Sequence, residues 1–82
     1  MLNVELVSPE KKVWSGEAVS VSARTLEGDL GILTDHAPLL GVLVDGEVVI
    51  KGTDRSTNTF SVAGGFLSVS NNRVSILAES AN

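Results

Sequence analysis

The chain has 82 residues, with six Lys and Arg against ten Asp and Glu and no Cys. This length is enough for one domain and too little for two, so we expect a single domain over residues 1–82. The lack of Cys excludes disulfides, thiolate metal sites and catalytic thiols, and a net charge of −4 argues against nucleic acid or anionic lipid as a partner.

The predicted elements are strands. Val, Ile and Thr are frequent, eight Gly are spread along the chain, and apolar residues recur at every second position rather than at helical spacing. Turn residues interrupt these stretches about every ten residues, which is typical of an all-β sandwich. Six sets of alternating residues are expected to face its core: Leu2, Val4 and Leu6; Val19, Val21 and Ala23; Val48 and Ile50; Phe60 and Val62; Leu67 and Val69; and Val74, Ile76 and Ala78.

The longest apolar run, Ala37 to Val44, has eight residues and is interrupted by Pro38 and Gly41. It is far shorter than the roughly 18 residues that span a bilayer, so no membrane insertion is expected. The first residues show no secretory signal. Within this run, Leu39 to Val44 is apolar on both faces of the pleat except at Gly41. Such a strand is either covered twice or presents one apolar side to a partner.

Three dipeptides predict backbone geometry. Asp45-Gly46 lies between two apolar stretches and is expected to form a type I′ hairpin, and Asn71-Asn72 is expected to do the same. Gly64-Gly65, inside a strand-like stretch, indicates a bulge or a close approach of two backbones.

The residues that carry chemistry are few. His36 is the only His, so any acid–base mechanism would have to pass through it. Its grouping with Asp35, Asp29 and Glu27 matches no metal-ligand spacing. Gly28 to Gly31 is not followed by the helix that a phosphate cradle needs. We therefore expect a non-enzymatic chain without a metal or other cofactor.

The remaining signals concern surfaces. The three aromatic residues, Trp14, Phe60 and Phe66, are too few for a sugar-binding platform and are expected to fill the core or its edge. Outward positions are often Ser where a free-standing sheet would carry Lys or Glu, namely Ser20, Ser22, Ser61, Ser68, Ser70 and Ser75. Together with a mean hydropathy of +0.25, this favours a chain that docks to other proteins.

Several motifs, in order along nearly the whole chain, resemble the ε subunit of F-type ATP synthases. The most specific is the stretch from Ala23 to Leu33, ARTLEGDLGIL, followed by His36-Ala37-Pro38-Leu39-Leu40. The other matching segments are Val7 to Glu10, Val13 to Ala18, Gly64 to Leu67 with Val69, and Val74 to Glu79.

The resemblance implies the family's N-terminal domain, a flattened β-sandwich of about ten short, mostly antiparallel strands. It also implies a non-catalytic part of the central stalk that binds the γ subunit and rests on the ring of c subunits, coupling ion-driven rotation to ATP synthesis. Contacts with the ring fall on Glu27, Gly28, Asp29, Leu30 and Gly31, where carboxylates can pair with basic side chains. Contacts with γ fall on Ser8, His36, Pro38, Leu39, Leu40 and Gly41. The implied location is peripheral, on the cytoplasmic face of a bacterial membrane or the stromal side of an organellar one.

Two departures from the family pattern stand out. The family usually has Pro-Gly before His-Ala-Pro, whereas this chain has Thr34-Asp35. The family also usually continues into a C-terminal helical hairpin that inhibits ATP hydrolysis and sometimes binds ATP, and only Ser80, Ala81 and Asn82 follow Glu79 here. We therefore expect no helical hairpin and no bound nucleotide.

Two other functions fit an acidic β-sandwich of this size. A lipoyl- or biotinyl-type carrier needs a modifiable Lys at a hairpin tip, and the nearest candidate, Lys51, precedes Gly52 at a strand end. A carbohydrate-binding module needs an aromatic groove.

Overall fold

The computed structural model describes residues 1–82 and contains seven β-strands and no helix, and therefore no helix able to cross a membrane. The expected all-β sandwich is confirmed, but with fewer strands than ten. Two strands are 14 residues long and serve both layers, where separate short strands were expected. The strands are β1 (Leu2–Val7), β2 (Lys12–Thr25), β3 (Gly28–Leu33), β4 (Leu39–Leu43), β5 (Gly46–Gly52), β6 (Thr57–Ser70) and β7 (Arg73–Ala81).

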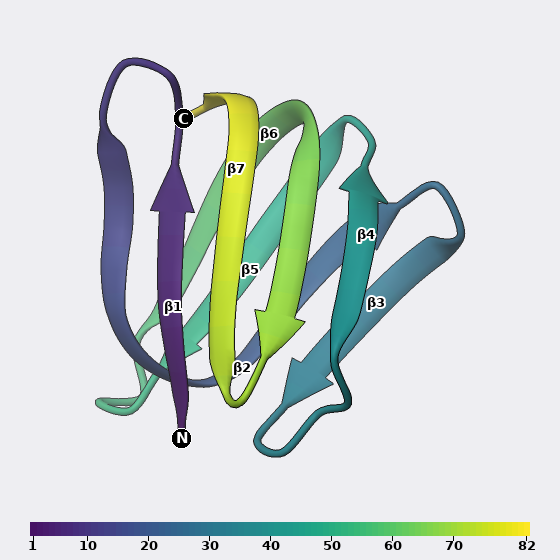
Figure 1. Ribbon diagram of the computed structural model, residues 1–82. Coiled ribbons are helices and arrows are strands. Elements are labelled where there is room, and N and C mark those ends of the chain that lie inside the picture. Colours follow the sequence, from purple (N-terminus) through teal and green to yellow (C-terminus); the bar gives the residue numbers. More distant parts are fainter.

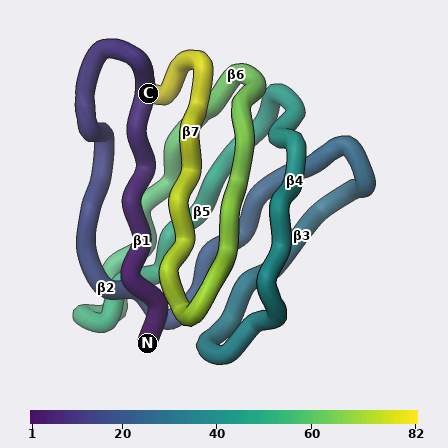
Figure 2. Tube along the Cα trace, viewed as in Figure 1, coloured from purple at the N-terminus to yellow at the C-terminus, as the bar shows by residue number.

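The strands form two layers that share β2 and β6 (Figure 1). Layer one, in front, consists of the first half of β2, then β1, β7, the second half of β6 and β4. Layer two, behind it, consists of the first half of β6, then β5, the second half of β2 and β3. All neighbours are antiparallel except β1 and β7, which run parallel side by side in the chain trace (Figure 2).

A bulge marks the point where β2 passes from one layer to the other. Its pairing with β5 shifts register between Ala18 and Ser20. The extra residue reverses the in–out alternation, so Ala18 is buried while Val19 is 45% exposed. The prediction that Val19 faces the core is therefore wrong, although Val21 and Ala23 do face it.

Gly64 and Gly65 form the corresponding corner of β6. Pairing with β5 ends at Val62, and pairing with β4 begins at Gly65. Both glycines have positive φ, +65° and +126°, and a Cβ on Gly65 would overlap the carbonyl oxygen of Leu77 on β7. The predicted close approach of two backbones is confirmed, while the pairing with β7 stays in register.

The two predicted hairpin turns have different outcomes. Asn71 and Asn72 have φ of +50° and +61° and join the paired residues Ser70 and Arg73, as a type I′ turn requires. Asp45-Gly46 is not a hairpin: neither residue has positive φ, and β4 and β5 do not pair. This segment instead carries the chain from layer one to layer two.

The core lies between the layers and consists of 16 buried apolar residues. Leu2, Leu6, Ile32, Ile50, Leu67 and Ile76 are fully enclosed, and such a side chain contributes about 1.5–3 kcal/mol when buried. Trp14 and Phe60 pack against this core, as predicted. Phe66 does not: it is 54% exposed, because its neighbour Leu67 takes the inward position on the pleat.

Candidate protein-docking surfaces

An apolar row crosses the outer face of layer one. Val42, Phe66 and Leu77 are direct cross-strand neighbours on β4, β6 and β7, and they are 42%, 54% and 54% exposed. Val7 of β1 pairs with Leu77 and extends the row. Contiguous exposed apolar side chains on adjacent strands make this face a candidate docking surface.

Strand β4 supplies a further exposed apolar residue. Gly41 and Leu43 face inward, whereas Leu40 and Val42 face outward, and Leu40 is 73% exposed. Of the two arrangements that the sequence left open for Leu39–Val44, the structure shows the second, with one apolar side uncovered. Leu40 lies opposite Ser68, two residues before Val42 of the apolar row on the same face of β4.

The six residues expected to face γ are spread along layer one and its two ends. Ser8 lies in the β1–β2 turn and lines a shallow apolar pocket with Pro9, Phe66 and Leu77. Pro38 and Leu40 are exposed and His36 is half-buried, while Leu39 packs against the core and Gly41 is buried. Sequence analysis did not identify the exposed residues Val42, Phe66 and Leu77 as partner contacts. Each is next in sequence to a buried residue, so the alternation of the strand places it on the outer face.

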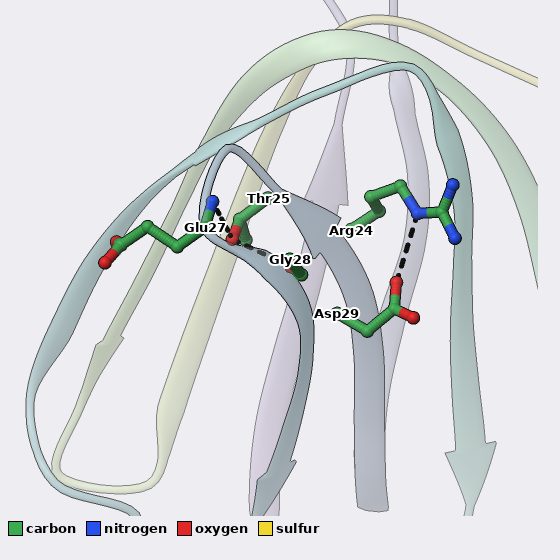
Figure 3. A network of polar contacts seen from close by, with 5 residues as sticks. All are labelled: Arg24, Thr25, Glu27, Gly28 and Asp29. Carbon is green, nitrogen blue, oxygen red and sulfur yellow. Dashed lines mark hydrogen bonds and ion pairs between the residues drawn. The ribbon is translucent and has the colours of Figure 1, made fainter.

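The five residues expected to face the c-ring lie at the turn between β2 and β3. We call this segment, from Arg24 to Gly31, the charged hairpin. The Thr25 hydroxyl donates to the carbonyl oxygen of Gly28 at 2.9 Å and accepts from the amide of Glu27 at 3.2 Å (Figure 3). Thr25 and Gly28 also pair across the strands. These contacts hold the tip, where Glu27 and Gly28 are exposed.

Asp29 points outward beside Arg24, its direct cross-strand neighbour. The Arg24 Nε donates to Asp29 Oδ1 at 3.1 Å, and both side chains remain mostly exposed. Leu30 differs from its neighbours because it packs against the core, whereas Gly31 is open to solvent. The exposed charged groups of the hairpin are therefore the carboxylates of Glu27 and Asp29 and the guanidinium of Arg24, which pairs with Asp29.

The charged hairpin and the apolar row are adjacent. The amide of Leu26 donates to the carbonyl oxygen of Val42 at 3.0 Å, and the amide of Val44 donates to that of Arg24 at 3.1 Å. Leu26 is 70% exposed at the tip, and sequence reasoning did not single it out. The charged hairpin and strand β4 of the apolar row are thus joined by backbone hydrogen bonds.

In the turn that carries His36, Asp35 adopts a positive φ, a conformation that usually favours glycine. The His36 amide donates to the carbonyl oxygen of Leu33 at 3.2 Å, and Asp35 has φ of +64°. Asp tolerates this region better than most residues. Thr34-Asp35 therefore forms a tight turn with Asp35 at the position of positive φ. The Nδ1 of His36 lies 2.8 Å from the carbonyl oxygen of Ala37.

The two alternative functions lack their sites. Lys51 is in β5, paired with Ser20 and Thr57, and not at a hairpin tip. Trp14 and Phe60 are half-buried against the core, which leaves Phe66 as the one exposed aromatic side chain. A single exposed ring does not make a sugar-binding groove.

Comparison with known sequences identifies close relatives. A family model described as "ATP synthase, Delta/Epsilon chain, beta-sandwich domain" matches residues 1–82. The ATP synthase epsilon chain of Micrococcus luteus is 56% identical over 80 residues, which cover 98% of this chain and 88% of the relative. The epsilon chain of Frankia casuarinae is 52% identical, covering 98% and 94%. That of Streptomyces avermitilis is 51% identical over 95% of this chain, which spans only 63% of the relative's length.

Solved structures share the fold. A chain in the mitochondrial ATP synthase of Euglena gracilis superposes with a TM-score of 0.92 at 22% identity, over 99% of this chain and 52% of that one. A chain in the central stalk and c-ring assembly of Tetrahymena thermophila gives 0.86 at 24% identity, over 99% and 65%. With the family model and the epsilon-chain relatives, these findings show that the chain belongs to the ATP synthase delta/epsilon family and forms its β-sandwich domain.

Proposed function

We propose that the chain is a non-catalytic rotor subunit of an ATP synthase, joining the γ subunit to the ring of c subunits. The observation that carries this proposal is the apolar row of Val42, Phe66 and Leu77 on layer one, in a chain that belongs to this family. In this role the chain performs no chemistry. It transmits rotation between two partners and leaves ATP synthesis to other subunits.

The two surfaces receive different partners. The γ subunit covers the outer face of layer one, from Ser8 at one end to the turn with His36 and Pro38 at the other, with Leu40 and the apolar row between them. Leu39 and Gly41 belong to this face through the backbone of β4, because the Leu39 side chain packs on the core and Gly41 is buried.

The c-ring meets the charged hairpin, where the Glu27 and Asp29 carboxylates attract basic groups on the ring. Gly28 and Gly31 allow close approach because both positions are open. Leu30 supports the hairpin from the core side. The bacterial relatives favour the cytoplasmic face of a bacterial membrane over an organellar location, and recovery of the chain with washed bacterial membranes carrying the synthase tests this.

The first test is co-expression with the γ subunit from the same source, followed by size-exclusion chromatography with light scattering. We expect a one-to-one complex. If the folded chain elutes alone, the assay is repeated with α, β and γ together, to test whether γ needs α and β in order to fold. A second failure would overturn the proposal.

A matched pair of variants assigns the surface. Phe66→Asp places a charge in the apolar row and is expected to abolish the complex, because an unpaired charge in a contact is strongly unfavourable. Thr59→Asp adds the same charge at an exposed position of β6 in layer two, where Thr59 pairs with Val49 of β5, and is expected to bind γ normally. Equal loss of binding in both variants would exclude layer one as the specific contact.

A further inference from the structure

Two turns from distant parts of the sequence are joined by a reciprocal pair of hydrogen bonds. The backbone amide of Asp35 donates to Oδ1 of Asn72 at 2.6 Å, and Nδ2 of Asn72 donates to Oδ1 of Asp35 at 3.1 Å. Asn72 lies in the β6–β7 turn, and its carbonyl oxygen accepts the amide of Asn3 of β1 at 2.8 Å. Asn72 therefore ties the turn after β3 to a turn that is itself anchored in layer one.

The turn after β3 needs such support. It closes with the bond from the His36 amide to Leu33 and has positive φ at its third residue, Asp35. Turns of this kind are best formed by Pro followed by Gly, since Pro fixes the second residue and Gly adopts positive φ freely. Thr34 and Asp35 provide neither advantage. An external contact that fixes the Asp35 amide and carboxylate together restricts the turn to this conformation.

We infer that Asn72 is a positioning residue that fixes the turn from Leu33 to Pro38, and thereby His36 and Pro38, for binding of the γ subunit. The part of this inference that concerns γ rests on the proposed function. Asn72 acts through Asp35 and does not itself belong to the expected γ contacts.

Asn72→Asp is the informative variant, with Asn71→Asp as its control. Both residues lie in the same turn with positive φ, both changes add one negative charge, and Asp tolerates that conformation. Only Asn72 contacts Asp35, so Asn72→Asp sets two carboxylates against each other. The double variant Asp35→Asn with Asn72→Asp exchanges the two groups and restores one amide and one carboxylate at no change in net charge. Asn72→Gly removes the side chain while retaining positive φ.

Two measurements are made on each folded variant: hydrogen exchange of the Asp35 amide in the chain alone, and the dissociation rate from the γ complex. We expect Asn72→Gly, which removes both hydrogen bonds, to accelerate both by about tenfold, as for loss of a hydrogen bond that holds a local structure. Asn72→Asp keeps an acceptor for the Asp35 amide but replaces the second hydrogen bond by repulsion between two carboxylates, so we expect it to accelerate both as well, by less than Asn72→Gly. Asn71→Asp should match the unmodified chain, and the exchanged double variant should recover most of the change.

Each contrary result is distinct. Equal behaviour of Asn72→Asp and Asn71→Asp overturns the role of Asn72. Faster exchange with an unchanged dissociation rate overturns the link to γ. Failure of the unmodified chain to bind γ, both alone and together with α and β, overturns the proposed function and the γ part of this inference, while the exchange data still decide whether Asn72 fixes the turn.

Discussion

At the scale of single residues, Asp29 combines an exposed charge with a local partner. Its ion pair with Arg24 is mostly open to solvent, and such pairs contribute about 0.2–1 kcal/mol. The fold therefore depends little on this carboxylate, whereas an opposing basic surface would depend on it strongly.

Asp29→Lys is accordingly expected to leave thermal unfolding nearly unchanged and to reduce ATP-driven proton pumping in assembled complexes. Asp29→Asn, which removes the charge without reversing it, should have a smaller effect. Normal pumping by complexes that contain the Lys variant would exclude Asp29 from the ring contact.

Asp54 illustrates a local effect of hydrogen bonding on ionisation. The hydroxyl of Ser56 donates to Asp54 Oδ1 at 2.6 Å, and the amide of Ser56 donates to the same oxygen at 3.0 Å. These bonds favour the carboxylate and hold the pKa of Asp54 below its ordinary value of 3.8. Gly52 leaves room for the arrangement, because a Cβ there would lie 2.9 Å from both Asp54 Oδ1 and Ser56 Oγ.

A group with a lowered pKa in the folded state stabilises the fold above its unfolded pKa, and this contribution is lost as the pH falls through the folded value. We expect an NMR titration to give Asp54 a midpoint below 3.8, and Ser56→Ala to raise that midpoint. A midpoint that Ser56→Ala leaves unchanged would contradict the assigned cause.

At the scale of elements, the corner of β6 depends on one backbone position. Gly65→Ala is expected to destabilise the fold by about 3 kcal/mol or more, because positive φ and overlap with the Leu77 carbonyl both oppose a side chain. Gly31→Ala on β3 meets no atom within 4 Å and should change stability by less than about 1 kcal/mol. Urea unfolding of both variants tests this, and similar midpoints would refute the steric argument.

Strand β4 separates stability from binding. Because Leu40 is exposed in the isolated chain, Leu40→Glu should leave its circular dichroism and unfolding temperature almost unchanged. In the complex the same charge would be buried without a partner, so we expect the variant to be lost from γ during co-purification. Its normal recovery with γ would remove Leu40 from the interface.

Features set by neighbouring residues were predicted correctly from the sequence, whereas features that depend on distant strands were not. The alternation of β1, β5 and β7 predicted their buried faces, and Asn71-Asn72 predicted a turn, because neighbouring residues decide these features. Val19 and Asp45-Gly46 were misassigned because a bulge and a crossing between layers depend on distant strands. Phe66 was assigned to the core by residue type, although the position of Leu67 places it outside. The residues expected to contact γ or the ring stay predictions, since partner contacts are not determined by the chain alone.

At the scale of the whole molecule, the first and last strands are neighbours. Strand β1 pairs only with β2 and β7. Its pairing in layer one is therefore complete only after β7, residues 73–81, has joined the sheet. Proteins dominated by such distant pairings fold slowly, in about milliseconds to seconds. We expect refolding on this timescale when followed by the fluorescence of Trp14, the only Trp. Microsecond refolding would contradict the topological argument.

The passage of β2 and β6 through both layers has a mechanical consequence. In a sandwich of two separate sheets, a shear force between the sheets is resisted by side-chain packing. Here a force applied to the β2–β3 hairpin reaches layer one along the covalent backbone of β2, and β6 provides a second such connection. Any displacement of one layer against the other must therefore bend the backbone of β2 and β6 at their corners, in addition to disturbing the packed side chains.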